Sequence, residues 1–149
     1  MTDRCIFCED KFEDESIKRY DYWDLQLFRD DQYYIGRTVA VFKSRHIVDV
    51  TELESEEREE LFNTVIPELQ ESLDSLFEPD LYNYTSIGND CRHLHFHIIP
   101  RYKKSKTFNG KQFEDEQWDE TYAQDYQPVL LDEKDREDLI ARIKSNMPD

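Results

Sequence analysis

Residues 93–102, "HLHFHIIPRY", alternate histidine with apolar residues and contain three of the chain's four histidines. Successive side chains of a β-strand point to opposite faces. His93, His95 and His97 would therefore share one face, spaced about 7 Å apart at a rise of roughly 3.3 Å per residue. The apolar residues between them would pack on the other face. The segment predicts a strand with one core face and one face of imidazoles.

The remaining pattern predicts further strands and two helices. Alternating or β-branched apolar residues indicate strands at 23–30, 38–43 and 81–87, and the last would form a hairpin with 92–102. Apolar residues recur at three- and four-residue steps from Leu61 to Phe77, which indicates a long helix. Pro67 would kink this helix or break one of its turns. A last helix is expected at about 132–145, with Asp132 as its N-cap. Residues 103–128 give no assignable pattern. The fold class is α+β, with an antiparallel sheet of about five strands.

Length and charge limit the kind of protein this chain can be. Its 149 residues fit one domain, 1–149, with one hydrophobic core. A net charge of −16 repels nucleic-acid backbones and anionic membrane surfaces, so neither is an expected partner. No apolar run is long enough for a membrane span or a signal peptide, and three cysteines do not suggest a disulfide framework. These features predict a cytoplasmic protein.

The residues leave three interpretations of the histidine motif open. It could be a solvated stripe on a sheet, a metal site built from all three imidazoles, or a catalytic site. Ligands from separate elements converge on an ion more readily than neighbours on one flat strand do. A neutral imidazole attacks phosphorus well and leaves well, which suits phosphoryl or nucleotidyl transfer in two steps.

The motif resembles the signature of the histidine triad (HIT) superfamily, in which histidines alternate with apolar residues. "CIFC", "YYIGRTVAVFKSRH", "LYNYTSIGND" and the following "PRY" are also similar to bacterial and Fhit-like HIT hydrolases. The resemblance covers about residues 5–102, and residues 103–149 would form a C-terminal extension. It implies a HIT-like fold and a homodimer paired through the sheet edge and the long helix.

The resemblance also implies roles for the histidines. His95 would be the nucleophile that carries the nucleoside monophosphate as a covalent nucleotidyl-histidine, and water would then release it. His97 would contact the α-phosphate or the bridging oxygen. His93 would orient the nucleophile by hydrogen bonding.

Substrate-binding residues follow from the same resemblance. Asn89 lies where HIT proteins place a polar side chain on the phosphate, and the turn at Gly88 could add backbone N–H groups. The usual ribose-binding position falls on Arg29, so the adjacent Asp30 is the predicted ribose ligand. Arg37 stands where some Fhit-like proteins have histidine.

A zinc site is the second implication. Cys5 and Cys8 form a C-x-x-C pair, and in similar bacterial proteins such a pair binds zinc together with the histidines that correspond to His46 and His93. The predicted site is structural. The alternative is that both cysteines are ordinary buried thiols.

The predicted function is a nucleotide hydrolase or transferase that acts on nucleoside phosphates such as dinucleoside polyphosphates. Two alternatives stay open: a nucleoside phosphoramidate hydrolase, and a non-catalytic nucleotide-binding or zinc-stabilised interaction protein. A role in nucleic-acid repair is disfavoured by the net charge. The basic stretch "RYKKSK", residues 101–106, could hold the distal phosphates of a substrate or could be a solvated loop.

Overall fold

The computed structural model describes residues 5–89, 91–120 and 126–148. Five antiparallel strands form one sheet in the order β1-β2-β3-β5-β4. Their bounds are β1 Ser16–Arg19, β2 Trp23–Leu27, β3 Thr38–Phe42, β4 Leu81–Thr85 and β5 His95–Arg101. The α+β class and the five-stranded antiparallel sheet predicted from the sequence are confirmed.

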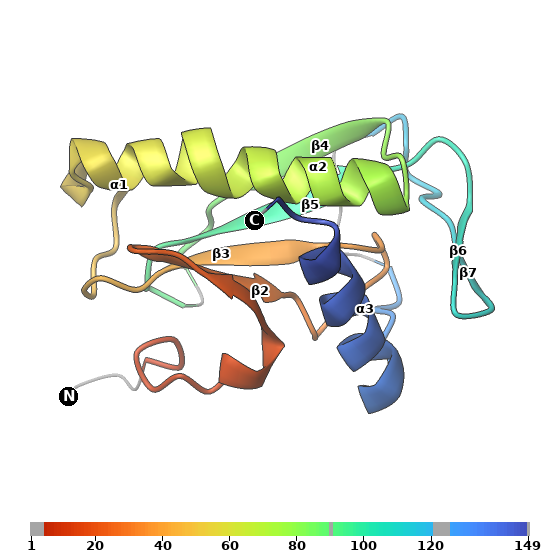
Figure 1. Ribbon diagram of the computed structural model, residues 1–149, viewed down its shortest axis with the longest axis horizontal. Coiled ribbons are helices and arrows are strands. Elements are labelled where there is room, and N and C mark those ends of the chain that lie inside the picture. The colour runs from red at the N-terminus through yellow and green to blue at the C-terminus, as the bar shows by residue number, and fades with distance from the viewer. Residues whose placement is uncertain (1–4, 90, 121–125, 149) are drawn as a thin grey trace.

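Helices cover one face of the sheet. A long helical run, α1 (Ser55–Glu60), η3 (Leu61–Val65) and α2 (Ile66–Leu76), crosses the sheet, and α3 (Glu133–Ser145) packs beside its C-terminal half (Figure 1). The core between the layers contains Trp23 and Leu25 from β2, Leu69 from α2 and Leu139 from α3. Asp132 caps α3, as predicted, by accepting a 2.8 Å hydrogen bond from the backbone N–H of Asp135.

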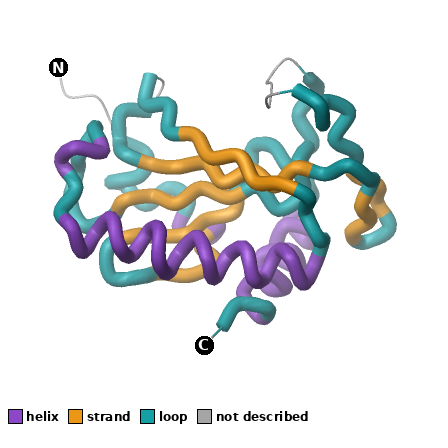
Figure 2. Tube along the Cα trace, turned by 90° about the horizontal axis from the view of Figure 1, so that it is seen from above, coloured by secondary structure: helices purple, strands orange, loops and turns teal. Residues whose placement is uncertain are grey.

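One turn of the long helix, directly before Pro67, departs from the α-helical pattern, but the helix does not end there. The turn before it, Leu61–Val65, is a π-helix, and α2 begins directly afterwards with Pro67 in its first turn. Proline lacks an N–H and its ring crowds the carbonyl four residues earlier, and a wider π turn relieves both constraints. The helix therefore continues past Pro67 (Figure 2), and buried apolar residues from both of its parts belong to one core cluster with those of the sheet.

The opposite face of the sheet is covered by the N-terminal segment. Phe7 packs on Val39 and Val41 of β3, and Ile6 and Phe12 lie against the same cluster. This smaller cluster brings the first described residues of the chain next to the histidine motif, because Phe7 contacts the rings of both His93 and His95.

The hairpin that carries the histidines is shorter than predicted. Strand β5 begins at His95, not at 92, and pairs with both β3 and β4. The backbone N–H of Leu94 instead bonds the carbonyl of Ile47. His93 therefore precedes the strand, and its side chain is free to adopt a direction of its own.

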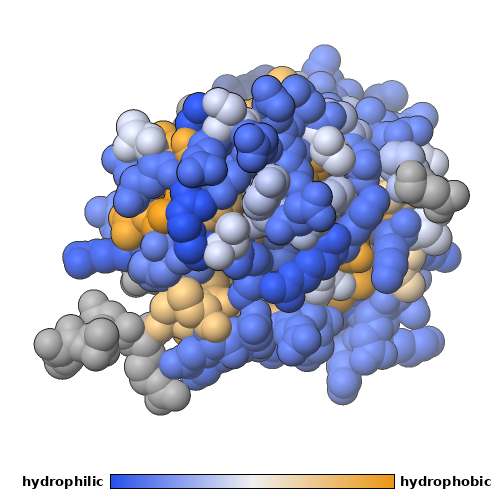
Figure 3. All heavy atoms as spheres, turned by 60° about the vertical axis from the view of Figure 1, so that its left-hand side comes forward, coloured by the Kyte–Doolittle hydropathy of each residue, from blue (hydrophilic) through white to orange (hydrophobic). Residues whose placement is uncertain are grey.

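The stretch that had no predicted structure contains a second, small hairpin. Strands β6 (Lys106–Phe108) and β7 (Lys111–Phe113) pair with each other away from the main sheet (Figure 1). Within the described ranges, no helix has the length and apolar character needed to cross a membrane. The surface seen in Figure 3 is mostly hydrophilic, with small apolar areas between polar residues.

Candidate active site and metal centre

The ring of His95 is fixed by a main-chain contact. Its Nδ1 lies 2.6 Å from the carbonyl oxygen of His93. A carbonyl oxygen only accepts, so Nδ1 carries the proton, and in the neutral ring Nε2 holds the lone pair. His95 is buried, with 6% of its surface exposed, and it lines a pocket on the face of the sheet opposite the helices. The pocket wall thus includes an imidazole whose neutral form has its lone pair on Nε2, the nitrogen suited to nucleophilic attack.

His97, two residues along the strand, has the opposite tautomer. Its Nδ1 lies 3.2 Å from Nη2 of Arg37. A guanidinium only donates, so Nδ1 of His97 accepts and Nε2 carries the proton. Burial, followed by the nearby charge of Arg37, lowers the pKa of His97 to about 3. The two neighbouring rings, 5.4 Å apart between centroids, therefore combine a lone pair on one with an N–H on the other.

His93 faces away from this pair. Its Nε2–H bonds the carbonyl oxygen of Phe42, so its Nδ1 holds a lone pair directed at Cys5 and Cys8. His95 donates its Nδ1–H to the main-chain carbonyl of His93 and not to its imidazole. His93 thus links two sites, one through its ring and one through its backbone.

The pocket has a volume of about 310 Å³ and mixed walls. Apolar side chains from the N-terminal segment and the sheet line it together with Gln26, Arg37 and the two pocket histidines. Gln26 on β2, Val39 on β3 and His97 on β5 are consecutive cross-strand partners. Strands lie about 4.8 Å apart, so the row extends roughly 10 Å across the sheet. An elongated ligand can therefore reach both Gln26 and the imidazoles.

The predicted substrate residues are only partly in this pocket. Asp30 lines it, next to Arg29. Gly88 and Asn89 lie in the loop between β4 and β5 and are not among its lining residues. Asp31, the neighbour of Asp30, is buried and accepts hydrogen bonds from the backbone N–H groups of Tyr33 and Val129. Asp30 is thus the accessible carboxylate of the adjacent pair.

The four predicted metal ligands converge. Cys5, Cys8, His46 and His93 come from three separate segments, and their ligand atoms all lie within 4.8 Å of one another. Sulfur–nitrogen separations are 3.3–3.4 Å, and the two Nδ1 atoms of the histidines are 3.2 Å apart. In a tetrahedral zinc site, Zn–S and Zn–N bonds of about 2.3 and 2.05 Å give separations of about 3.6 and 3.3 Å. Donor types and spacing therefore fit a closed four-coordinate ion.

The electrostatics of the cluster favour a cation. Burial raises the pKa of the Cys8 thiol, and the adjacent Cys5 raises it further through its hydrogen bond and charge. Two thiolates side by side repel each other unless a cation lies between them. Burial also lowers the pKa of His93, which keeps its imidazole neutral, the form that binds metals. All four residues are thus arranged as ligands.

Two pocket residues were not predicted as parts of the site. Gln26 donates through Nε2 to Asp24 at 2.9 Å, and Asp24 also accepts from the hydroxyl of Ser16. Arg37 contacts His97 and stacks over Phe28 at 4.4 Å. On β2, Asp24 and Gln26 alternate with the core residues Trp23 and Leu25, and this alternation is visible in the sequence. Only the strand order, however, places them on the face that carries the histidines.

The sheet, the long helix and the paired histidines on β5 define a histidine-triad fold, and comparisons with known proteins agree. The model of the HIT domain family matches residues 12–104. "Protein hit" of Bacillus subtilis is 32% identical over 137 residues, which are 87% of this chain and 88% of that protein. The chain belongs to the HIT domain family.

Solved structures show the same fold at lower identity. A histidine triad protein of Sinorhizobium meliloti is 20% identical with a TM-score of 0.71, and the match covers 93% of this chain and 94% of that one. A Zn-bound histidine triad family protein of Mycobacterium smegmatis is 18% identical with a TM-score of 0.60, and that match covers 95% and 91%. The predicted family and fold are confirmed.

Proposed function

We propose that the protein is a nucleotidyl hydrolase or transferase that acts on nucleoside phosphates through a covalent intermediate on His95. The observation that carries the proposal is the hydrogen bond from Nδ1 of His95 to the carbonyl of His93, which leaves the Nε2 lone pair at the pocket. Family membership supports nucleotide chemistry in general. The substrate and the covalent step are our inference.

The chemistry proceeds in two displacements at one phosphorus. Nε2 of His95 attacks the α-phosphorus, a P–N bond forms, and the bond to the leaving oxygen breaks. Water then attacks the same phosphorus, the P–N bond breaks, and the water proton passes to solvent as the nucleoside monophosphate forms. His97 presents its Nε2–H to a phosphoryl or bridging oxygen, where a hydrogen bond stabilises charge that develops in the transition state.

The protonation of His97 favours anhydride substrates. A nucleotide or polyphosphate leaves as an anion and needs only hydrogen bonds, whereas an amine must gain a proton as it leaves. With its pKa lowered to about 3 by burial and Arg37, His97 has no second proton to give near pH 7. Dinucleoside polyphosphates are therefore the leading substrate class, and nucleoside phosphoramidates are the alternative.

The pocket has room for a nucleoside along the row from Gln26 to His97. The base would lie over Val39 and beside Gln26, the ribose hydroxyls would bond Asp30, and the phosphate would meet the imidazoles. Gly88 and Asn89 are proposed to complete the phosphate site from the loop that precedes His93. This placement is supported by the pocket's dimensions and its mixture of apolar and polar walls.

The test is incubation with a panel of dinucleoside polyphosphates and adenosine 5′-phosphoramidate, followed by chromatography of the products. We expect a nucleoside monophosphate from each polyphosphate, with faster turnover than for the phosphoramidate. Rapid quenching should also trap an acid-labile nucleotidyl adduct on the protein. Tight nucleotide binding without any product would instead support the non-catalytic alternative.

We also propose that the ion held by Cys5, Cys8, His46 and His93 is zinc and that its role is structural. The set of two thiols and two imidazoles supports this, as do the sulfur–nitrogen and nitrogen–nitrogen separations close to those of a tetrahedral zinc site. A bound zinc would connect the N-terminal segment, which lines the pocket, to His93. The carbonyl of His93 in turn orients the ring of His95. With four protein ligands it has no open position for substrate.

The zinc proposal is tested by metal analysis of protein produced with zinc supplied. We expect near one zinc per chain in the wild type, and loss of zinc with a lower melting temperature in Cys8→Ser. Cys91→Ser is the matched control and should keep its metal. An absence of metal from the wild type would reject the site.

The proposal extends to assembly and compartment. The protein is proposed to be one domain, because core residues from Ile17 to Met147 form a single cluster. A homodimer is supported by the edge strand β4, whose Leu81 and Tyr84 are about half exposed. The cytoplasm, where thiols stay reduced, suits two cysteine ligands. Light scattering should give twice the monomer mass of 18.1 kDa, and a monomer would contradict the dimer.

A further inference from the structure

The side chain of Arg37 is a buried charge beside the histidines. It is 4% exposed and lies 3.9 Å from the carboxylate of Asp31, its ion-pair partner. Its guanidinium also stacks on Phe28 and contacts Nδ1 of His97 at 3.2 Å. Because a guanidinium cannot accept a hydrogen bond, any arrangement that keeps Arg37 in place also keeps His97 in the Nε2–H tautomer.

Asp31, in turn, is held by the C-terminal extension. One carboxylate oxygen accepts from the backbone N–H of Val129 at 3.0 Å, and the other accepts from the hydroxyl of Tyr126. Tyr126 also lies 3.5 Å from Nη1 of Arg37. Burial and the charge of Asp31 raise the pKa of Tyr126, so its hydroxyl remains a donor. A residue 89 positions further along the chain thus touches both members of the ion pair.

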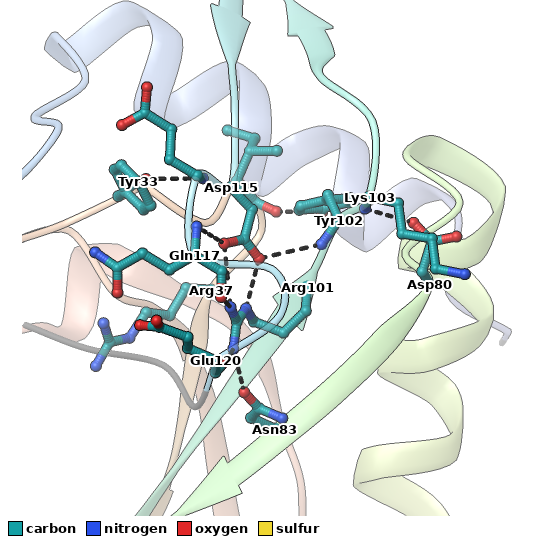
Figure 4. Close-up of polar contacts among 12 residues, drawn as sticks. Tyr33, Arg37, Asp80, Asn83, Arg101, Tyr102, Lys103, Asp115, Gln117 and Glu120 are labelled. Carbon is teal, nitrogen blue, oxygen red and sulfur yellow. Dashed lines mark hydrogen bonds and ion pairs between the residues drawn. The ribbon is translucent and has the colours of Figure 1, made fainter.

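The extension is anchored in two places, on the connection between β2 and β3 and on the end of β5. The ring of Tyr126 stacks on Tyr33 at 4.1 Å, and the backbone N–H of Gln32 bonds the carbonyl of Val129 at 2.7 Å. Earlier in the extension, Asp115 and the backbone of residues 117 and 120 bind Arg101 at the end of β5 (Figure 4). These contacts fix the position of Tyr126 relative to the sheet.

We propose that the C-terminal extension positions the reactive histidines: Tyr126, through Asp31 and Arg37, holds His97 in the tautomer that presents Nε2–H to the phosphoryl group. Tyr126, Asp31 and Arg37 act here as positioning residues. The use of that N–H rests on the proposed function, whereas the tautomer itself does not. The extension is then a functional part of the site, although none of its described residues lines the pocket.

The experiment reads the tautomer directly by NMR. Protein labelled with ¹⁵N-histidine gives long-range ¹H–¹⁵N correlations that distinguish a protonated from an unprotonated ring nitrogen, and only four histidines need assignment. His97→Gln identifies the signals of His97. In the wild type we expect one tautomer at His97, protonated at Nε2, from pH 6 to 8.

Three variants separate positioning from general stability. Tyr126→Phe removes only the hydroxyl and should move the His97 nitrogen shifts toward a tautomer average and lower kcat about 3- to 10-fold, with KM within about twofold. Arg37→Met should shift the His97 nitrogen signals further, to those of a mixture of both tautomers, and should raise the pH at the midpoint of the His97 titration. Arg37→Lys should restore part of the wild-type spectrum. Tyr33→Phe is the matched control, because it keeps the stacked ring and its hydroxyl contacts Glu116.

The outcomes distinguish this inference from the proposed function. A His97 spectrum in Tyr126→Phe identical to that of the wild type would overturn the inference even if the protein turns over nucleotides normally. An equal change in Tyr33→Phe would also overturn it, since the effect would then come from loosening of the extension. A changed spectrum in Tyr126→Phe alone, in a protein that cleaves no nucleotide, would support positioning and reject the proposed activity.

Discussion

The two ends of strand β5 carry polar side chains that are used in opposite ways. At its start, His95 and His97 each use one ring nitrogen for a protein contact and keep the other at the pocket. At its end, Arg101 uses all five of its N–H donors inside the protein. Its partners are both oxygens of Asp115, the side-chain oxygen of Asn83 and the carbonyls of Gln117 and Glu120 (Figure 4).

This difference separates polar groups that can meet a ligand from those used within the protein better than charge or burial alone. Arg101 and His95 are both buried, and both lie in a segment that the sequence marks as functional. Only His95 retains an atom that can contact a ligand, whereas Arg101 has no donor left for a phosphate. Arg101 is therefore a structural residue that fastens the extension.

The largest effect is expected from removing the Nε2 atom of His95, the ring nitrogen that makes no hydrogen bond within the described part of the chain. His95→Asn keeps a polar side chain of similar reach but cannot form the P–N bond. We expect turnover to fall on the order of 10³-fold or more, while nucleotide affinity stays within a few-fold. Steady-state kinetics and calorimetric titration with a product nucleotide measure the two effects. Retention of most activity would remove His95 from the nucleophile role.

Replacing Arg101 should lower the free energy of unfolding. Arg101→Met leaves the carboxylate of Asp115 buried without its cation, which costs about 3–5 kcal/mol of the free energy of unfolding. Urea denaturation measures the change, and Lys104→Met, an exposed neighbour in the same segment, is the control. Loss of activity at unchanged stability would show instead that Arg101 belongs to the reactive end of the strand.

His97 gives a test that depends on pH. Its pKa is lowered to about 3 by burial and Arg37, against about 6.5 in an unfolded chain. Between these values the unfolded state binds a proton that the folded state does not, so His97 contributes stability above pH 6.5 that is lost as the pH falls. Between pH 7 and pH 5, the free energy of unfolding should fall by about 1–2 kcal/mol more in the wild type than in His97→Gln. Equal losses in urea denaturation would mean that His97 titrates normally.

Much of this arrangement could be predicted from the sequence. The 3.6-residue and two-residue periods gave the long helix and the strands, and the four ligand positions converge as the resemblance implied. The start of β5 was misplaced by three residues because the alternation of His93 and Leu94 looks like a strand, while their contacts follow a loop. The link between Arg37 and Tyr126 could not be predicted, because it joins residues 89 positions apart that share no local pattern.

The smallest expected effect concerns the lysines that follow Arg101. A phosphate clamp would require Lys103, Lys104 and Lys106 to face the pocket, but none of them lines it. The ammonium of Lys103 lies 5.6 Å from the ring centroid of Trp118, and that of Lys106 lies 5.8 Å from the ring of Tyr102. These positions favour the solvated-loop interpretation of the basic stretch.

Replacing the three lysines together by alanine tests that interpretation. We expect changes below about twofold in kcat/KM, equal for a dinucleoside tetraphosphate and for a phosphoramidate, because exposed charges far from the reacting phosphorus are screened. A clamp on distal phosphates would raise KM for the tetraphosphate alone, and the increase would shrink in high salt. That selective loss would extend the reactive part of β5 beyond the histidines and past Arg101. An equal, small change would confine it to the first three residues of the strand, where ring nitrogens remain available to a ligand.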